Sequence, residues 1–249
     1  KASPSRLPAR SVLLAAHSRQ RSPPATRTPR RTQNLLAGCI FDSSAVKSAF
    51  ALLLTRVTEP RTGKFMRLEV YIMQRTISAM VGKGSVNHNS RKFKAENVDG
   101  ERSHLNIDYC NEPIKKIYHE LFDDALKRYN EKQTRADRRI ENYYEKIRNP
   151  KQEKPFHELI LQIGDKENMS AESENGQLSR QILDEYYRRF QERNPNLKVF
   201  SAHLHMDEAT PHLHIDFVPF TTGSKRGLDT RVSLKQALAA QGFKGGTRG

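Results

Sequence analysis

The sequence predicts an α+β fold in which an antiparallel sheet has helices packed on one face and is preceded by a disordered basic extension. Segments with the two-residue alternation of strands occur among segments whose apolar residues recur every three or four positions, as in helices. Two of the strand-like segments are joined by a short turn, which indicates antiparallel pairing. The composition changes at about residue 65, before which no sustained period is found.

The first 65 residues are rich in Ser, Pro, Arg and Ala and hold most of the positive charge. They contain 12 Lys or Arg against two acidic residues, a net charge of +10, whereas residues 66–249 contain 31 against 26, a net +5. A transit peptide and a basic DNA-binding arm both fit this composition. We prefer to take Met66 as the native start, so that 1–65 is a non-native disordered extension and 66–249 is the domain. The bulk charge therefore gives weak support for DNA binding.

Two other features exclude broad classes of protein. No stretch of about 18 apolar residues occurs, so no membrane span is expected. Cys39 and Cys110 are the only cysteines and lie far apart, which argues against a disulfide framework or a zinc knuckle. This cysteine content suits a reducing cytoplasm.

The first half of the domain begins with a predicted strand at 67–76, which leads into a Gly-bounded polar loop that contains His88. Asn111 as cap, with Pro113 in the first turn, predicts the start of an amphipathic helix that continues to about residue 129. The charged stretch that follows is expected to remain helical until Asn149-Pro150.

The second half alternates strands and helices. Strands are predicted at 156–163, 197–206 and 212–220, and helices at 178–193 and 232–241. The connection 207–211 between the last two strands has a length that is common in hairpins.

Four of the nine histidines lie within twelve residues of this hairpin, at 203, 205, 212 and 214. Strand alternation places His212 and His214 on one face, and the hairpin brings His205 across from them. Three imidazoles in this arrangement can bind a divalent ion and leave positions open for substrate. Glu208 in the turn is expected to complete the shell or orient a ligand. His203 lies further from the turn and is expected to be structural, and the role of Asp216 stays open.

Three segments in order resemble the motifs of the plasmid Mob/Pre (MobV-type) relaxases, a branch of the HUH endonucleases. The string from His205 to His214 resembles the metal-binding motif of this family, residues 87–91 its amino-terminal catalytic motif, and residues 101–106 its second motif. The resemblance extends from about Met66 to the carboxyl end and implies an HUH relaxase-like fold. The family continues beyond the equivalent of Gly249, so we expect the carboxyl-terminal part to be missing here.

The resemblance implies metal-dependent, site-specific nicking and rejoining of plasmid DNA at a transfer origin or recombination site. His88 maps to the nucleophile, which would form a covalent phosphoramidate with the DNA 5′ phosphate, and Glu208 is the second catalytic residue. The predicted metal ligands are His205, His212 and His214, and the predicted DNA contacts are Asn89, Arg91, Arg102, His104 and Asn106.

The cofactor implied is a divalent metal ion, and three imidazole ligands favour Mn²⁺ over Mg²⁺, although cellular supply can override that preference. The partner implied is plasmid DNA, with a homodimer formed through the missing carboxyl-terminal region. The location implied is the bacterial cytoplasm.

Several alternatives remain open at the level of sequence. The chain could be an HUH replication initiator or transposase, a plasmid DNA-binding protein without independent relaxase activity, or a hydrolase with a three-histidine zinc site. Tyr143 and Tyr144 are the nucleophiles that a generic relaxase would suggest, but their spacing from Ile140 and Ile147 predicts helix packing.

Overall fold

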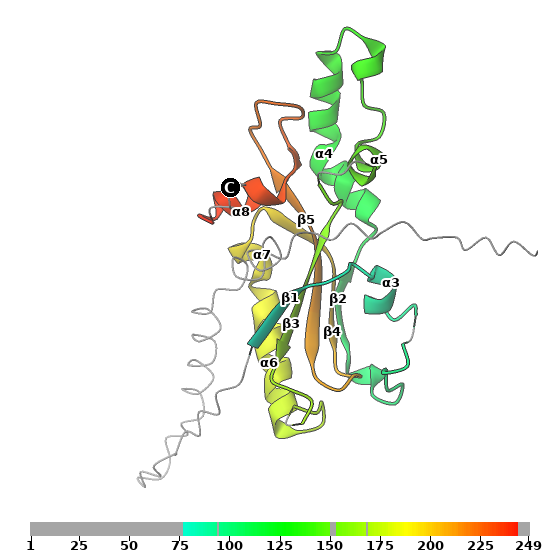
Figure 1. Ribbon diagram of the computed structural model, residues 1–249, viewed down its shortest axis with the longest axis vertical. Coiled ribbons are helices and arrows are strands. Elements are labelled where there is room, and N and C mark those ends of the chain that lie inside the picture. Colours follow the sequence, from blue (N-terminus) through cyan, green and yellow to red (C-terminus); the bar gives the residue numbers. More distant parts are fainter. Residues whose placement is uncertain (1–76, 94, 150–152, 168, 244–249) are drawn as a thin grey trace, which may run out of the picture.

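The computed structural model describes residues 77–93, 95–149, 153–167 and 169–243 (Figure 1). The basic extension at 1–65 and the predicted strand at 67–76 lie outside the described residues. No helix within the described ranges is both long enough and apolar enough to span a bilayer.

The described part is built around a twisted antiparallel sheet with the strand order β1-β3-β5-β4-β2 (Figure 1). Its strands are β1 (Ile77–Val81), β2 (Ile107–Asn111), β3 (His157–Ile163), β4 (Leu197–His205) and β5 (His212–Thr221). A short strand, β6 (Arg231–Val232), pairs with the end of β5. The predicted α+β class with an antiparallel sheet is therefore confirmed.

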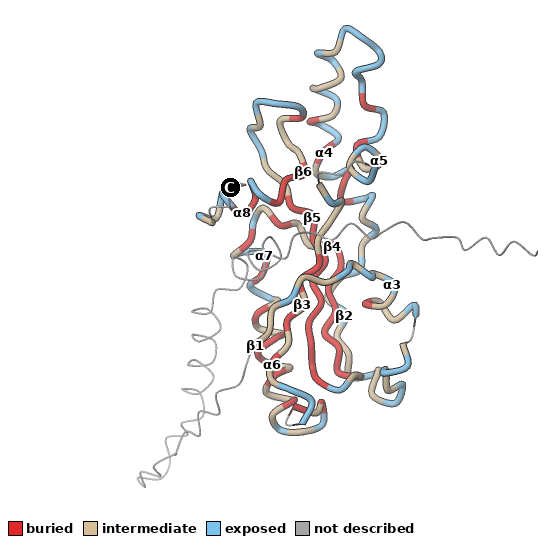
Figure 2. Tube along the Cα trace, in the orientation of Figure 1, coloured by how far each residue is buried: buried red, intermediate tan, exposed pale blue. Residues whose placement is uncertain are grey.

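One face of the sheet is covered by helices. Leu213, Ile215 and Phe217 of β5 alternate along this face and are fully buried. Figure 2 shows that β5 is buried along most of its length. The three residues belong to the cluster formed with α6 (Glu174–Arg188), α7 (Phe190–Arg193) and α8 (Leu234–Ala240). The intervening residues of β5, His212, His214 and Asp216, project from the opposite face, as the two-residue period requires.

A second apolar cluster lies at the end of the sheet that is remote from the β4–β5 turn. Here α4 (Ile114–Glu131) and α5 (Tyr143–Arg148) pack against Phe200 and Val218. The pairing of β4 with β5 shifts register between Val199 and Ser201, which leaves Phe200 unpaired in a β-bulge. Because α4 and α5 pack at this remote end, no long helix of the described part covers the face with His212 and His214 near the β4–β5 turn.

The predicted continuous helix through the charged stretch was wrong. The helix α4 ends at Glu131, and a turn with the short 3₁₀ helix η2 (Ala136–Arg138) precedes α5. The Asn130 side chain closes this turn by accepting from the Ile140 backbone N–H and donating to the Ile140 carbonyl. Asn142 then caps α5 by accepting from the backbone N–H of Glu145. Asn130 thus offers the backbone an alternative to continuing α4, and Asn142 starts a new helix.

Three further predictions differ in detail from the structure. Asn111 does not cap α4, because it is still paired with Ser201 in the sheet, and Pro113 is the N-cap residue. The strand β2 was not predicted. His88 lies in the four-residue helix α3 (Val86–Asn89) rather than in an open loop.

Candidate metal centre and catalytic site

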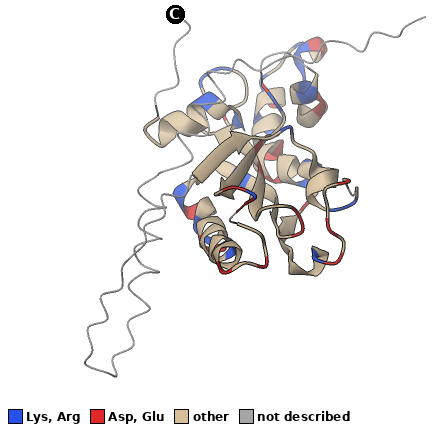
Figure 3. Ribbon diagram, turned by 60° about the horizontal axis from the view of Figure 1, so that its bottom comes forward, with Lys and Arg blue, Asp and Glu red and all other residues tan. Residues whose placement is uncertain are grey.

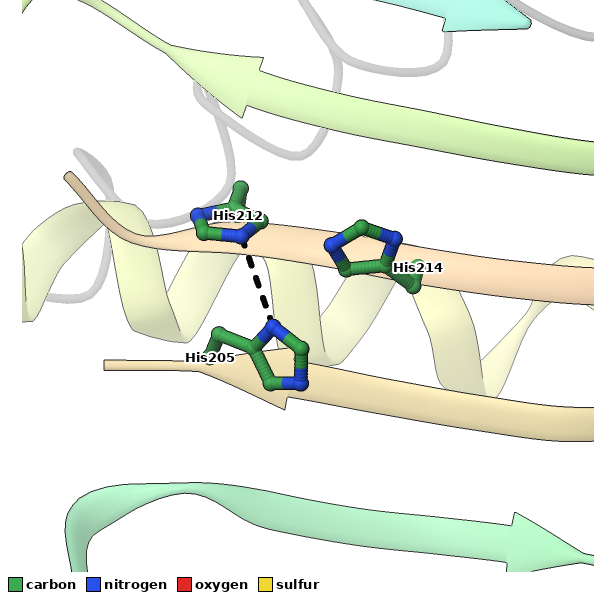
Figure 4. Close-up of side chains that lie close together, drawn as sticks. All are labelled: His205, His212 and His214. Carbon is green, nitrogen blue, oxygen red and sulfur yellow. Dashed lines mark hydrogen bonds between the residues drawn. The ribbon is translucent and has the colours of Figure 1, made fainter. Parts of the chain in front are cut away.

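The three histidines predicted as metal ligands converge at the turn end of the sheet. His205 ends β4 and pairs directly with His212, the first residue of β5, and His214 follows on the same face. One ligand nitrogen from each ring lies within 4.8 Å of the other two (Figure 4). We call these three residues the histidine triad. The hairpin therefore produces the arrangement that strand alternation predicts.

The hydrogen bonds of the triad indicate which nitrogen of each ring is protonated. His205 Nε2 lies 2.8 Å from the Asn89 carbonyl, His212 Nδ1 lies 2.8 Å from the Thr210 carbonyl, and His214 Nδ1 lies 2.7 Å from Glu158 Oε1. A carbonyl or carboxylate oxygen can only accept, so each of these nitrogens donates. The other nitrogen of each ring is left with a lone pair.

The remaining nitrogens fit a bound cation. His205 Nδ1 and His212 Nε2 lie 3.4 Å apart with both lone pairs available, and His214 Nε2 is buried without a hydrogen-bond partner among the described residues. An unsatisfied buried polar atom costs about 1–3 kcal/mol, and facing lone pairs repel. A divalent cation bound by the three nitrogens removes both costs. Imidazole is a ligand that suits transition ions such as zinc, copper, iron and nickel.

Burial keeps His205 and His212 in the form that binds metal. It lowers the pKa of His205 to about 2, and the neighbouring His214 and His212 rings add to the shift. Burial likewise lowers the pKa of His212. Because only a neutral imidazole can coordinate a metal, both rings are ready to bind at neutral pH.

Glu158 of β3 forms a hydrogen bond with His214 of the triad and was not singled out in the sequence analysis. Besides His214, its carboxylate accepts from the Gly84 backbone N–H at 2.7 Å and from the Asn89 side chain at 2.7 Å. These hydrogen bonds lower the pKa of Glu158 even though its burial alone would raise it. One buried carboxylate thus ties a triad ring to the segment that contains His88.

Asp216 lies directly opposite Glu158 in the sheet and is fully buried. Burial raises the pKa of Asp216 to about 7, and the charge of Glu158 adds to this effect. Its carboxylate accepts from the Asn89 side chain at 3.2 Å. Asp216 therefore belongs to the support beneath the triad.

His88 and Glu208, the two predicted catalytic residues, face each other beside the triad. His88 Nε2 lies 3.6 Å from Glu208 Oε1, and the same oxygen lies 3.9 Å from His205 Nδ1 and 3.7 Å from His212 Nε2. The His88 ring centre is 6.2 Å from that of His205. The His88 side chain is 24% exposed, so a substrate can reach it.

Arg91 is held by two carboxylates of the β4–β5 turn. Its guanidinium donates to both oxygens of Asp207, with Nε at 2.9 Å, and to Glu208 Oε1 at 2.9 Å. Arg91 also has a φ of 54°, a left-handed conformation that costs a non-glycine residue about 1–2 kcal/mol. The ion pairs with the turn hold this conformation, and in doing so they fix the position of Glu208.

The other residues predicted to contact DNA are distributed differently. Asn89, the residue after His88, is buried, and Asn106 is bound to the turn through Asp207 and the backbone N–H of Met206. Arg102 is paired with Asp99 at 2.8 Å. His104 is exposed and bonds to the Glu101 carbonyl.

Sequence reasoning identified the triad but missed the acidic residues that position it. Asp207 accepts from Arg91, Asn106 and Ser103, and these hydrogen bonds lower its pKa to about 2 although its burial opposes the shift. Glu158 could have been noticed as the single acidic residue of the predicted strand 156–163. His203 is structural, as predicted, because Asp108 and Ser201 contact its two ring nitrogens.

Comparisons with known proteins identify relatives. The chain is 28% identical over 151 residues to a plasmid recombination enzyme of a Bacillus species, an alignment that covers 58% of this chain and 32% of the relative. It is 29% identical over 165 residues to a plasmid recombination enzyme type 2 of Staphylococcus aureus strain Mu50, covering 65% and 35%. The chain thus spans about a third of the length of these relatives.

Among solved structures, the MobM relaxase domain bound to plasmid pMV158 oriT DNA, with manganese, aligns with 68% of this chain and 88% of that domain. The identity is 22% and the TM-score is 0.39. The family model described as plasmid recombination enzyme (Mob_Pre) matches residues 83–241, which include His88, Glu208 and the histidine triad. Because that match covers more than half of the chain, the protein belongs to the Mob_Pre family of plasmid recombination enzymes.

Proposed function

We propose that the protein nicks one strand of plasmid DNA at a transfer origin or recombination site and rejoins it through a covalent link to His88. The observation that supports this most directly is the position of Glu208 Oε1, which lies within 4 Å of His88 Nε2 and of two triad nitrogens. A nucleophile, a proton acceptor and a set of metal ligands are thereby gathered around a space where one phosphate can be bound.

His88 is suited to act as the nucleophile. With its proton on Nε2, beside Glu208, the imidazole has a lone pair on Nδ1 for attack on phosphorus. The new P–N bond replaces the bond from phosphorus to the 3′ oxygen, and the Nε2 proton passes to Glu208. The 3′ oxygen takes a proton from solvent, which gives a 3′ hydroxyl and a phosphoramidate on the DNA 5′ phosphate. Rejoining reverses these transfers without ATP.

The triad would hold a divalent ion, for which we propose Mn²⁺ or Mg²⁺. Such an ion supplies Lewis acidity toward the phosphate oxygens. Glu208 is kept in place by Arg91, and Glu158 orients His214 through its Nδ1–H. The protein thus provides a fixed donor set before substrate binds.

Direct DNA contact by the five predicted residues stays a proposal. Arg102 and His104 border the turn and can reach a phosphate backbone. For Asn89, Arg91 and Asn106 we propose a positioning role, because their side chains already bind Glu158, Asp207 or Glu208. A homodimer and a role in plasmid mobilisation belong to the same proposal, as does a location in the bacterial cytoplasm.

The proposal can be tested by incubating the full chain with supercoiled cognate plasmid and Mn²⁺, followed by denaturing gels. Wild type should yield a nicked circle, and His88→Ala and His212→Ala should each lose it. His119→Ala is the matched control, because His119 lies exposed on α4 and bonds only to Asp123 among the described residues. DNA binding without any nicking by wild type would instead favour a DNA-binding protein or an initiator that lacks relaxase activity.

A further inference from the structure

A basic surface lies at the end of the molecule remote from the triad. It consists of residues 127–148, from the end of α4 to α5, and of the loop 222–231 that follows β5, and we call it the basic arm. Arg128 is paired with Asp229 at 2.8 Å, and the Val232 N–H donates to the Tyr143 hydroxyl at 3.1 Å. These contacts hold the two segments side by side, as Figure 1 also shows.

The charge of the described residues is strongly polarised. The basic arm contains 11 Lys or Arg against five acidic residues, a net charge of +6. All described residues together contain 25 of each sign, so the remainder has a net charge of −6. Figure 3 shows Lys and Arg on the helices and the loop at this end of the molecule, as well as on other elements. The excess is therefore local, whereas the chain's total charge is dominated by residues 1–65.

Much of this charge is available to a partner. Arg128, Arg135 and Arg148 are paired with neighbouring carboxylates. Six other cations of the arm are exposed and have neither an ion pair nor a side-chain hydrogen bond among the described residues: Lys127, Lys132, Arg138, Lys146, Lys225 and Arg226.

The chemistry of the arm favours a polyanion over a protein or a lipid surface. The exposed large hydrophobic residues of the described part are Met80 and Phe93, and neither lies in the arm. A protein interface or a membrane site usually needs apolar anchors, whereas the phosphate backbone of DNA is bound mainly by Lys and Arg.

We propose that the basic arm binds the phosphate backbone of duplex DNA that flanks the strand held at the triad. This inference rests on the proposed function. The length of β5 gives the distance between the triad and the basic arm. The strand begins at His212 in the triad and ends at Thr221, next to the arm, so its ten residues separate the two by about 30 Å. A duplex rises about 3.4 Å per base pair, which places the arm about nine base pairs from the nick.

The test measures DNA binding by the full chain in EDTA, so that no nicking takes place. The probes are fluorescein-labelled single strands of arbitrary sequence joined to a duplex of about 5 or about 20 base pairs, because phosphate contacts are independent of sequence. The arm variant combines Arg138→Gln, Lys225→Gln and Arg226→Gln. The control combines Lys166→Gln, Arg188→Gln and Arg189→Gln, which removes the same charge from exposed residues outside the arm.

We expect wild type and the control to bind the long duplex more tightly than the short one, and the arm variant to lose this advantage. The slope of log affinity against log salt should become shallower by about one for each phosphate that the variant no longer binds, so by up to about three in the arm variant. Equal slopes for the arm variant and the control would overturn the proposal. A change in sedimentation of the free protein, with DNA binding intact, would also overturn it and assign the arm to self-association. If wild type does not nick DNA in the plasmid assay, the proposed function fails, but this result says nothing against DNA binding by the basic arm.

Discussion

At the scale of single residues, Glu158 shows how one side chain can position both halves of the site. Its carboxylate accepts from His214, from Asn89 and from the Gly84 backbone. A side-chain amide at this position would put an NH₂ group against at least one of these donors. The geometry of the triad should therefore depend on a residue that does not itself reach the metal.

We predict that Glu158→Gln weakens Mn²⁺ binding by about 10- to 100-fold, as for other residues that orient a metal ligand. Isothermal titration calorimetry on the full chain measures this directly. Asp184→Asn is the matched control, because Asp184 is a partly buried carboxylate on α6 that accepts from Tyr109 at 2.8 Å, away from the triad. Unchanged affinity in Glu158→Gln would show that the carboxylate has only a structural role.

A second prediction concerns His157, whose Nε2 is buried without a partner among the described residues. Burial lowers the pKa of His157 to about 4, and Lys154 adds to the shift. Below about pH 6.5, His157 therefore binds a proton in the unfolded chain but not in the native state. The free energy of unfolding falls as the pH drops toward 4. His157→Phe, which can still stack on Phe217, should remove up to about 1.4 kcal/mol per pH unit of this loss.

Urea denaturation at several pH values between about 4 and 7 measures the effect, because the difference between wild type and variant cancels the contribution of the carboxylates. Parallel pH profiles for the two proteins would refute it.

At the scale of elements, strand alternation made the hairpin and its histidines predictable. The turn residues 207–211 and the alternation of His212, Leu213 and His214 specify both the pairing and the faces. The elements that were mispredicted depend on contacts outside the local pattern. The strand β2 is an edge strand with exposed Asp108 and Asn111, so it lacks clear alternation.

The acidic supports of the site could not be predicted for a related reason. Glu158 meets His214 across 56 residues of sequence, and Arg91 meets Asp207 across 116. The sequence pattern of one strand shows which face a residue occupies, but the neighbouring strand depends on the sheet order. The triad could be predicted from the sequence because all three of its residues lie on one hairpin.

The start of α6 is packed closely against the backbone of residues 170–171. Gly176 lies in the first turn of the helix, and a Cβ added there would come within 1.9 Å of the Ser170 carbonyl oxygen. Alanine normally stabilises a helix relative to glycine by about 1 kcal/mol. Here overpacking against backbone should dominate, and Gly176→Ala should destabilise the protein by about 1–3 kcal/mol in urea denaturation.

Gln181→Ala, at an exposed position of the same helix, serves as the comparison and should change the free energy of unfolding by less than about 0.5 kcal/mol. A more stable Gly176→Ala variant would mean that the close packing of 170–171 against α6 is absent.

At the scale of the whole molecule, metal binding by the triad should be linked to folding. Its ligands come from β4 and β5 at the centre of the sheet, so the unfolded chain has no preformed site. At a Mn²⁺ concentration 100 times the Kd, the native state should gain about 2.7 kcal/mol. For a domain of this size that gain corresponds to a rise in Tm of about 5–10 °C.

Differential scanning calorimetry with and without Mn²⁺ measures this gain. EDTA should reverse it, and His212→Ala should abolish it, whereas His119→Ala should retain it. Stabilisation that persists in His212→Ala would place the bound metal elsewhere.

The charge distribution and the site together suggest one orientation for DNA along the molecule. In the proposed function, the strand that is cut would lie at the β4–β5 turn, and the flanking duplex would follow β5 toward the basic arm. The tyrosines that a generic relaxase would use are instead packed against neighbouring side chains. Tyr143 is buried, and Tyr144 packs edge-on against Tyr118 with ring centres 5.0 Å apart. Their structural role agrees with the sequence prediction.

The most direct test of the central claim is to identify the residue that becomes linked to DNA. After reaction with cognate plasmid and Mn²⁺, the adduct would be digested and its nucleotide-bearing peptide located by mass spectrometry. We predict an acid-labile phosphoramidate on His88 that is absent from His88→Ala. An acid-stable adduct on Tyr143, Tyr144 or another residue would contradict the account, as would cleavage by wild type that leaves no protein on the DNA.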